Sequence, residues 1–246
     1  MRNMNKFMAV AQIKWIGITR NPVIMTGPIF TVAMVYVFKI IYGMAFDGEL
    51  TPGIMSSLLN LGLTMNVCGD GFMMVGTAIA EEKEKHTLRA LMTSSVTGWQ
   101  YFLGSIFFPF IITVLINFAV LIISGVPMAR VFIPGFFAVS VMASLISCVI
   151  GMIVGICAKN QMSASLVGTP LMMVFMMIPL FGSMSEGLHK LSGFLFTGVL
   201  SEMAGSYATE AGYTIMPLDI AVLIGEFVIS VLVFLILYRK NGYEND

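Results

Sequence analysis

Three charged side chains lie away from the ends of long apolar runs of the sequence. Asp70 and Glu226 lie near the middle of their runs, and Lys39 lies in the second half of another. An ionisable side chain inside a bilayer is costly and by default marks a functional site, such as a proton or ion pathway. We therefore treat all three residues as intramembrane polar candidates.

Each candidate also has a purely structural interpretation. Asp70 or Glu226 can be protonated, or can accept hydrogen bonds within a helical bundle. Polar side chains that could be their partners are Asn60, Asn66, Asn117 and Ser230. Lys39 can extend its amine toward the outer surface, or it can pair with Asp47 or Glu49.

The sequence lacks the residue patterns of intramembrane proteases. A serine protease needs a histidine base beside its nucleophile, but His86 and His189 both fall in polar connections. No H-E-x-x-H zinc motif occurs, and Asp70 has no second aspartate at matching depth, because Asp219 sits at the end of its run. A glutamate pair like that of CAAX-processing enzymes is present, but matching intramembrane histidines are missing. We expect no catalytic residues, no metal ligands and no cofactor on this chain.

Composition identifies the chain as a membrane protein. Of its 246 residues, 58% are hydrophobic and only 11% are charged, and the mean hydropathy is +0.93. Soluble domains carry about 25% charged residues, so this chain could not cover a water-exposed surface. Thirteen basic residues balance thirteen acidic ones, which gives no electrostatic basis for binding nucleic acid. Three cysteines in apolar runs are predicted to be buried packing residues: Cys68, Cys148 and Cys157.

Six apolar runs are long enough to cross a bilayer, which requires about 20 residues each. They are predicted at residues 23–44, 54–80, 101–124, 134–158, 164–184 and 217–237. A short polar hairpin separates the fourth and fifth runs, and the second run is long and contains four glycines. The predicted fold class is an all-α membrane protein with six transmembrane helices, in one transmembrane domain of residues 1–246.

The basic residues are distributed unevenly between the two sides of such a bundle. With six spans both termini share a side, and ten of the thirteen basic residues fall on that side. The other three are Lys39, Arg130 and Lys190. Because basic loops are retained in the cytoplasm, both termini are predicted to be cytoplasmic. Residues 185–216 would then form an extracellular or re-entrant segment that caps the bundle, before the last span and the tail at 217–246.

Residues 1–22 precede the first span and have an amphipathic pattern. Apolar side chains recur at helical spacing, at Met4, Phe7, Met8, Ala11, Trp15 and Ile18. Lys6, Lys14 and Arg20 are expected to reach toward water or lipid phosphate. An apolar stripe with basic flanks and a tryptophan predicts a helix lying in the membrane interface. Its expected role is anchoring or contact with a partner subunit.

The connection at residues 81–100, between the second and third spans, is charged and lies on the predicted cytoplasmic side. Charged side chains such as Glu84 and Arg89 are available to one helical face. The apolar face is expected to hold Leu88, Leu91 and Met92. This pattern predicts a short amphipathic helix outside the membrane.

The segment EEKEKHTLRALMTSSV, from Glu81 to Val96, resembles a feature of the permease subunits of type-2 ATP-binding-cassette exporters. Their pattern is an acidic and basic run, then a threonine, two apolar residues and a small-residue stretch; Leu103-Gly104 is similar to its continuation. The six spans and the N-terminal helix agree with the small bacterial form of this family over almost the whole chain. The resemblance implies a coupling helix at 81–100. Its implied contacts with the ATPase subunit are Glu81, Glu82, Glu84, Thr87, Leu88, Arg89, Leu91 and Met92.

The chain contains no G-x-x-x-x-G-K-[ST] motif, so it has no phosphate-cradling loop of its own. The resemblance implies that ATP and Mg bind to separate ATPase subunits. It also implies that a second permease copy or a related permease chain completes the transporter in the bacterial cell membrane. The implied substrate is hydrophobic or amphipathic, such as a bacteriocin or other peptide, a drug or a lipid. The alternative is an ion-coupled carrier or channel that uses Asp70 and Glu226.

Overall fold

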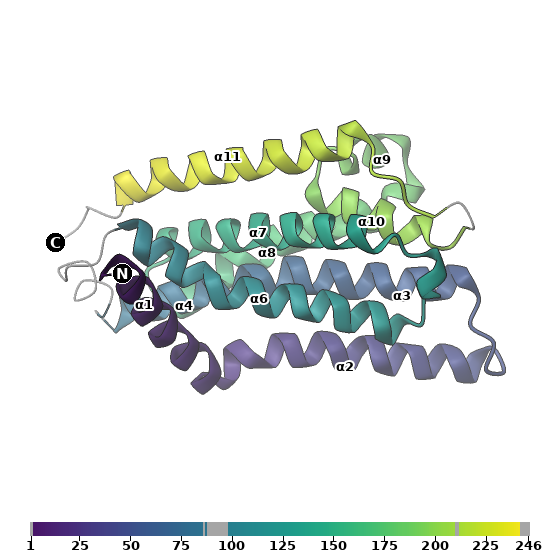
Figure 1. Cartoon of the computed structure of the whole chain (residues 1–246), viewed down its shortest axis with the longest axis horizontal. Helices are drawn as coiled ribbons and strands as arrows, with labels where there is room; N and C mark the ends of the chain where they lie inside the picture. Colours follow the sequence, from purple (N-terminus) through teal and green to yellow (C-terminus); the bar gives the residue numbers. More distant parts are fainter. Residues whose placement is uncertain (1, 86, 88–97, 210–211, 242–246) are drawn as a thin grey trace.

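A computed structural model describes residues 2–85, 87, 98–209 and 212–241. Within this part of the chain every regular element is helical, and the long helices lie side by side in an elongated bundle (Figure 1). Six helical segments are long and apolar enough to cross a membrane. They are α2 (Pro22–Ala45), α3 to α4 (Pro52–Glu84), α6 (Gly98–Ser124), α7 (Ile133–Cys157), α8 (Gln161–Leu180) and α11 (Pro217–Asn241). The prediction of an all-helical fold with six candidate spans is confirmed.

The predicted boundaries differ from the structure by three or more residues at four spans: the second, the fifth, the third, where α6 begins at Gly98, and the sixth, where α11 ends at Asn241. The second helical segment continues to Glu84, so the first charged residues of the predicted coupling helix extend this span instead. The fifth span begins at Gln161, earlier than the predicted residue 164, because Asn160 and Ser163 form a capping box. At the end of α7, Cys157 is exposed, so the prediction that it is buried is wrong.

A π-helical turn, Asn66–Gly71, divides the second span into α3 (Pro52–Met65) and α4 (Phe72–Glu84). Single π turns inside α-helices are rare and are frequently found at functional sites. A side chain of α7 supports this turn, because the Ser147 hydroxyl donates a hydrogen bond to the carbonyl oxygen of Val67. This long span therefore changes helix type near its middle.

The α4 and α7 helices approach each other closely because glycines lie at their contact. A β-carbon at Gly151 would lie 2.5 Å from the carbonyl oxygen of Phe72, and one at Gly155 would lie 2.8 Å from that of Gly76. Small residues four positions apart allow the backbones of membrane helices to pack in this way. This contact is the most extensive one between two helices in the described part of the chain.

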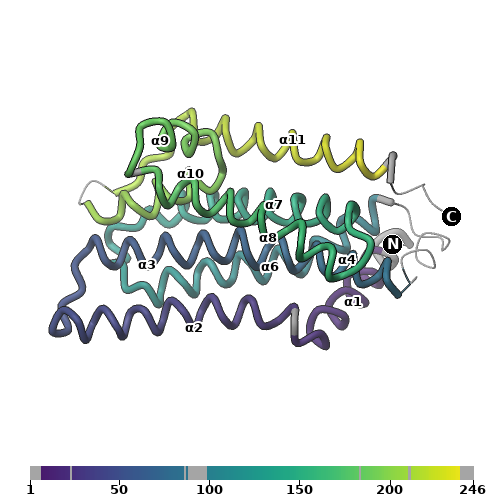
Figure 2. Tube along the Cα trace, turned by 180° about the vertical axis from the view of Figure 1, so that it is seen from behind, coloured from purple at the N-terminus to yellow at the C-terminus, as the bar shows by residue number. Residues whose placement is uncertain are grey.

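The two ends of the bundle hold different elements. The α1 helix (Arg2–Arg20), the last turn of α4 and the last turn of α11 lie at one end (Figures 1 and 2). We call this the terminal end. The opposite end, which we call the loop end, holds the α2–α3 and α6–α7 connections, α9 (Glu186–Ser192) and α10 (Phe196–Ser206) (Figure 1).

The α10 helix packs into the bundle at the loop end. The Phe196 side chain is fully buried, and its ring lies 5.3 Å from the ring of Phe175 and 6.5 Å from that of Phe72. The Ser56 hydroxyl of α3 donates to the carbonyl oxygen of Ala204 at 2.7 Å. Much of the predicted cap at residues 185–216 is therefore helical and is held against the spans.

The α1 helix packs along the first half of α6. A β-carbon at Gly104 of α6 would lie 2.7 Å from the Val10 side chain, so this glycine permits the close contact. The buried stripe of α1 contains Ala11, Lys14 and Ile18 in addition to Val10. The prediction that Lys14 reaches water or lipid is therefore wrong, because this lysine faces the bundle.

Candidate functional site

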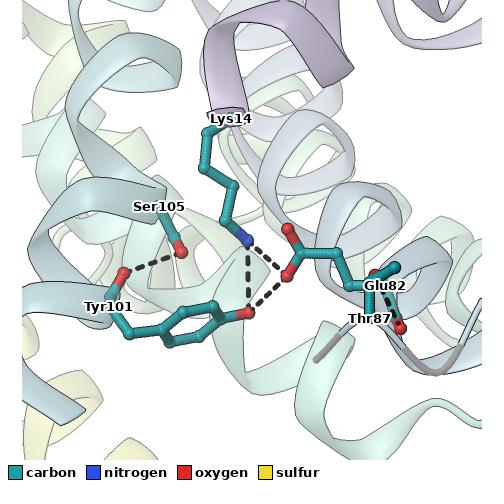
Figure 3. Close-up of polar contacts among 5 residues, drawn as sticks. All are labelled: Lys14, Glu82, Thr87, Tyr101 and Ser105. Carbon is teal, nitrogen blue, oxygen red and sulfur yellow. Dashed lines mark hydrogen bonds and ion pairs between the residues drawn. The ribbon is translucent and has the colours of Figure 1, made fainter. Parts of the chain in front are cut away.

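A buried charged cluster joins three helices at the terminal end. Lys14 of α1 is 3% exposed, and its Nζ donates to Oε2 of Glu82 at 2.6 Å. The Tyr101 hydroxyl of α6 donates to the same carboxylate oxygen at 2.7 Å, and Lys14 Nζ donates to that hydroxyl at 3.2 Å. Figure 3 shows the three side chains converging. The cluster ties α1 and α6 to the end of α4.

The Lys14 amine depends on these partners because it is removed from water. Burial lowers the pKa of Lys14, and the negative charge of Glu82 opposes that shift. The amine also lies 4.5 Å from the centroid of the Tyr101 ring, which adds a cation–π contact. Removing one member of a buried ion pair costs about 3–5 kcal/mol, because the remaining charge is left uncompensated.

The next two charged residues contact the connection between α7 and α8. Lys83 Nζ donates to the carbonyl oxygens of Ile156 and Ala158 at 2.5 and 2.6 Å, at the end of α7. Glu84 Oε2 accepts a hydrogen bond at 3.1 Å from the backbone N–H of Gln161, the first residue of α8. A cation at a helix C-terminus and an anion at a helix N-terminus both complement the helix dipole. These two charges therefore hold the α7–α8 hairpin against α4.

Glu81 extends the pattern to the junction of α1 and α2. Its Oε2 accepts from Nδ2 of Asn21 at 2.8 Å, and its Oε1 pairs with Nζ of exposed Lys85 at 2.5 Å. The hydrogen bond to Glu81 raises the pKa of Lys85. The Thr87 hydroxyl donates to the carbonyl oxygen of Glu82 at 3.2 Å (Figure 3). We call residues 81–84 and their partners the terminal-end junction.

An open cavity of about 390 Å³ lies beside this junction, between α1 and the end of α4. Its apolar wall includes Ile13, Ile18 and Ile24, and its charged edge includes Glu81 and Lys85. A partly apolar hollow with a charged edge is suited to receiving a side chain of another protein. The cavity therefore adds a concave surface to the junction.

The structure divides the predicted coupling residues into two groups. Glu81, Glu82, Glu84 and Thr87 are described, and each bonds to groups of this chain. The other predicted contacts, Leu88, Arg89, Leu91 and Met92, lie outside the described residues. The three acidic residues thus bond the start of the charged connection to other helices of this chain.

Sequence reasoning missed Lys14, Lys83 and Tyr101 as members of the junction. The burial of Lys14 had a detectable signal, because it falls between Ala11 and Ile18 at helical spacing. No sequence signal identifies Lys83 as a ligand of the α7 carbonyls, since that contact joins residues far apart in the chain.

Asp70 is held by α2 and not by the asparagines considered as its partners. Its Oδ2 accepts a hydrogen bond from the Thr31 hydroxyl at 2.8 Å. A β-carbon at Gly27, one turn earlier on α2, would lie 2.4 Å from the other carboxyl oxygen. The Asp70 carboxyl group therefore occupies a notch that a glycine and a threonine create in α2.

The asparagines form a separate network across the π turn. Asn66 Nδ2 donates to the Thr113 carbonyl oxygen at 2.7 Å and to Oδ1 of Asn117 at 2.8 Å. Asn117 Nδ2 donates in turn to the Ser144 hydroxyl at 3.3 Å. Side chains therefore fasten the π turn to α6 and α7, in addition to the bond that Asp70 makes with α2.

Glu226 of α11 caps α10. Its Oε2 accepts a hydrogen bond at 2.6 Å from the backbone N–H of Phe196, the first residue of that helix. The proposed partner Ser230 donates instead to the backbone oxygen of Glu226, at 2.7 Å. A carboxylate at a helix N-terminus matches the helix dipole, so a structural role is sufficient to explain Glu226.

Lys39 lies near the α6–α7 connection at the loop end. A β-carbon at Gly125 would lie 3.1 Å from the Lys39 Nζ. Among the described residues, no ion pair joins Lys39 to Asp47 or Glu49. The Lys39 amine therefore lies at the level of the α6–α7 connection, and its extension toward the outer surface stays a prediction.

Six candidate spans in one helical bundle are the architecture of a multi-pass membrane protein. The model of the ABC-2 family transporter protein matches residues 53–236, from the first turn of α3 to the last turns of α11. The chain therefore belongs to the ABC-2 transporter family. It is a non-catalytic, multi-pass membrane subunit, and permeases of this family work with ABC ATPase subunits. A comparison with curated proteins found no match.

Proposed function

We propose that this chain is the permease of an ATP-driven exporter in a bacterial cell membrane, with the terminal end in the cytoplasm. Its ATPase partner docks on the connection between α4 and α6, and ATP and Mg bind to that partner. The chain functions together with a second copy of itself or a related permease. Family membership and the concentration of basic residues at the terminal end support this assignment.

The terminal-end junction is the observation that carries the proposal. Within one helical turn, residues 81–84 contact α1, the α1–α2 junction, α6, and the hairpin between α7 and α8. A force applied to the connection that follows residue 84 is therefore delivered to most of the bundle at once. A loop that only joined two spans would not require contacts of this kind.

The substrate is proposed to be hydrophobic or amphipathic, such as a peptide, a drug or a lipid. The α8 helix supports this class, because it exposes large apolar side chains along its length, including Met162, Leu166 and Met173. Methionine side chains are flexible and polarizable, and they adapt to apolar ligands of different shapes. Direct transport of labelled peptides and dyes by vesicles containing the complete transporter would identify the class.

The test of ATPase docking changes Leu88 and Leu91 to Asp together. If these side chains enter an apolar groove of the partner, two charges in that groove weaken the complex by orders of magnitude, because each uncompensated burial costs several kcal/mol. We expect the double variant to insert into membranes but to lose the co-purifying ATPase and transport. Co-expression with the cognate ATPase, affinity purification and quantitative immunoblotting measure this loss.

Two controls separate docking from general damage. Leu191→Asp with Phe194→Asp introduces the same two charges at exposed positions of the loop end, and should leave the ATPase bound. Asp70→Asn should also leave it bound, because Asp70 lies within a span. An ion-coupled carrier requires the reverse, with Asp70→Asn abolishing flux and the Leu88/Leu91 variant active; that result would replace the exporter assignment.

A further inference from the structure

A second cavity, of about 600 Å³, opens at the loop end. It lies between the α6–α7 connection, residues 129–132, and the segment before α11, residues 212–215. These walls are far from the terminal-end junction along the bundle (Figure 1). The proposed coupling to an ATPase therefore does not use this cavity.

The wall formed by residues 212–215 is fixed by its backbone conformation and by bonds to α11. Gly212 has a φ of +68°, a left-handed conformation that favours glycine, and a β-carbon there would lie 3.3 Å from the carbonyl oxygen of Arg130. The Tyr213 hydroxyl donates to Oδ2 of Asp219 at 2.7 Å, and the Met216 N–H donates to the same oxygen at 3.0 Å. The backbone at Gly212 therefore passes close to the Arg130 carbonyl group, and the two bonds to Asp219 fix the following residues against the start of α11.

Arg130 supplies the charge of this cavity. The side chain is partly buried, and no hydrogen bond or ion pair joins its guanidinium to any residue that the structure describes. Asp219 of α11, which lies behind the opposite wall, is 6% exposed, and its Oδ2 is already bonded to Tyr213 and Met216. A partly desolvated guanidinium favours an anionic partner, and its planar donors match the oxygens of a phosphate or carboxylate group.

The position of the cavity indicates which anion reaches it. α7 begins at Ile133 and α11 begins at Pro217, so the cavity lies where two candidate spans end. Large apolar side chains beside it are exposed, and they are Phe132, Ile133, Met216 and Leu218. Span ends lie at the depth of lipid headgroups, and the planar donors of an arginine match the phosphate of such a headgroup.

We propose that this cavity binds a glycerophospholipid, with Arg130 on its phosphate and its acyl chains along the exposed apolar side chains of α7 and α11. The leaflet that provides the lipid depends on the orientation in the proposed function. Lipid binding itself does not depend on that orientation. A phospholipid headgroup and free inorganic phosphate both carry a phosphate group. The test must therefore distinguish binding of the lipid from binding of inorganic phosphate.

The test places a fluorescent reporter in the cavity. Phe132→Trp is introduced into the full-length chain after Trp15 and Trp99 are replaced by Phe, and the protein is purified in mild detergent. Short-chain phosphatidylglycerol with a brominated acyl chain should quench this tryptophan in a saturable manner. Arg130→Gln should raise the half-saturating lipid concentration about ten-fold, which corresponds to the free energy of one charge-assisted hydrogen bond. Arg130→Lys should raise this concentration less.

Matched variants and ligands complete the experiment. Thr214→Asp, at an exposed wall position, retains Arg130 but supplies it with an internal anion, and should reduce binding as Arg130→Gln does. Lys190→Gln removes an exposed cation elsewhere at the loop end and should have no effect. Brominated diacylglycerol, which lacks the phosphate, should not saturate the site.

Three results would overturn the proposal. They are equal quenching of the Arg130→Gln and parent proteins, equal affinity for the diacylglycerol, and complete displacement of the lipid by millimolar inorganic phosphate. The last would assign the cavity to a small anion. Lipid quenching is measured without an ATPase, so its failure leaves the docking test unaffected, and failure of docking leaves this result intact.

Discussion

Lys14 and Glu82 form the ion pair on which the terminal-end junction depends. Lys14→Met or Glu82→Gln alone leaves a partly desolvated group without its partner, and we expect each to lower the free energy of unfolding by up to about 3–5 kcal/mol. The double variant should recover part of this loss, because no uncompensated charge remains. Thermal unfolding in detergent gives the four values of the double-mutant cycle.

Lys159→Met is the control for this cycle. Lys159 is also a lysine of the terminal end, but it is exposed and makes no ion pair among the described residues. Its removal should change stability by less than about 0.5 kcal/mol. Strictly additive effects of the Lys14 and Glu82 changes would show that the two side chains do not act as a pair.

Some residues of the candidate sites can be predicted from the sequence, but their bonding partners cannot. Asp70, Glu226 and Lys39 could be selected because charges are rare in apolar runs. Their partners could not be, because Thr31, the Phe196 backbone and the Gly125 region come from distant parts of the chain. The amphipathic pattern of α1 was visible, yet the assumption that lysine avoids the buried face concealed the role of Lys14.

At the scale of elements, the contact between α4 and α7 depends on the absence of side chains. Gly151→Ala places a β-carbon 2.5 Å from the carbonyl oxygen of Phe72, so the two helices must separate. We expect a loss of about 1–3 kcal/mol, the usual cost of overpacking. Unfolding in a titration of sodium dodecyl sulfate against mild detergent measures this loss.

Gly225→Ala is the matched control within another span. A β-carbon at Gly225 has nothing within 4 Å, and alanine favours helix over glycine by about 0.5–1 kcal/mol. This variant should therefore be neutral or slightly more stable. If both variants behaved alike, close packing of α4 on α7 would not explain the effect.

Spans were predictable because about 20 consecutive apolar residues have few alternatives to a membrane helix. The ends of the spans were less predictable. For example, α8 begins where Asn160 and Ser163 form a capping box, and not where the hydropathy rises. The π turn had no reliable sequence signal. It is maintained by Ser147, Thr113 and Asn117, which reach it from two other helices.

For the whole molecule, single-cysteine labelling tests the proposed orientation. Cys157→Ser is the required background because that native cysteine is exposed, whereas Cys68 and Cys148 are buried. A cysteine at exposed Lys159 should react only from inside the cell, and cysteines at exposed Glu49 and Glu186 only from outside. Each site should react from both sides once the membrane is permeabilised. Labelling of Glu186→Cys from inside would reverse the orientation.

The π turn divides the second span into nearly equal arms. α3 has 14 residues and α4 has 13, and at 1.5 Å per residue each arm is about 20 Å long. The whole segment of 33 residues is therefore about 50 Å long, against about 30 Å for the hydrocarbon core of a bilayer. A rigid rod that pivots at its midpoint displaces its two ends equally and in opposite directions. Tilting about the π turn would therefore move Glu82 in one direction and the end of α3 that contacts α10 in the opposite direction. Because the two arms are equally long, the two displacements would have the same size.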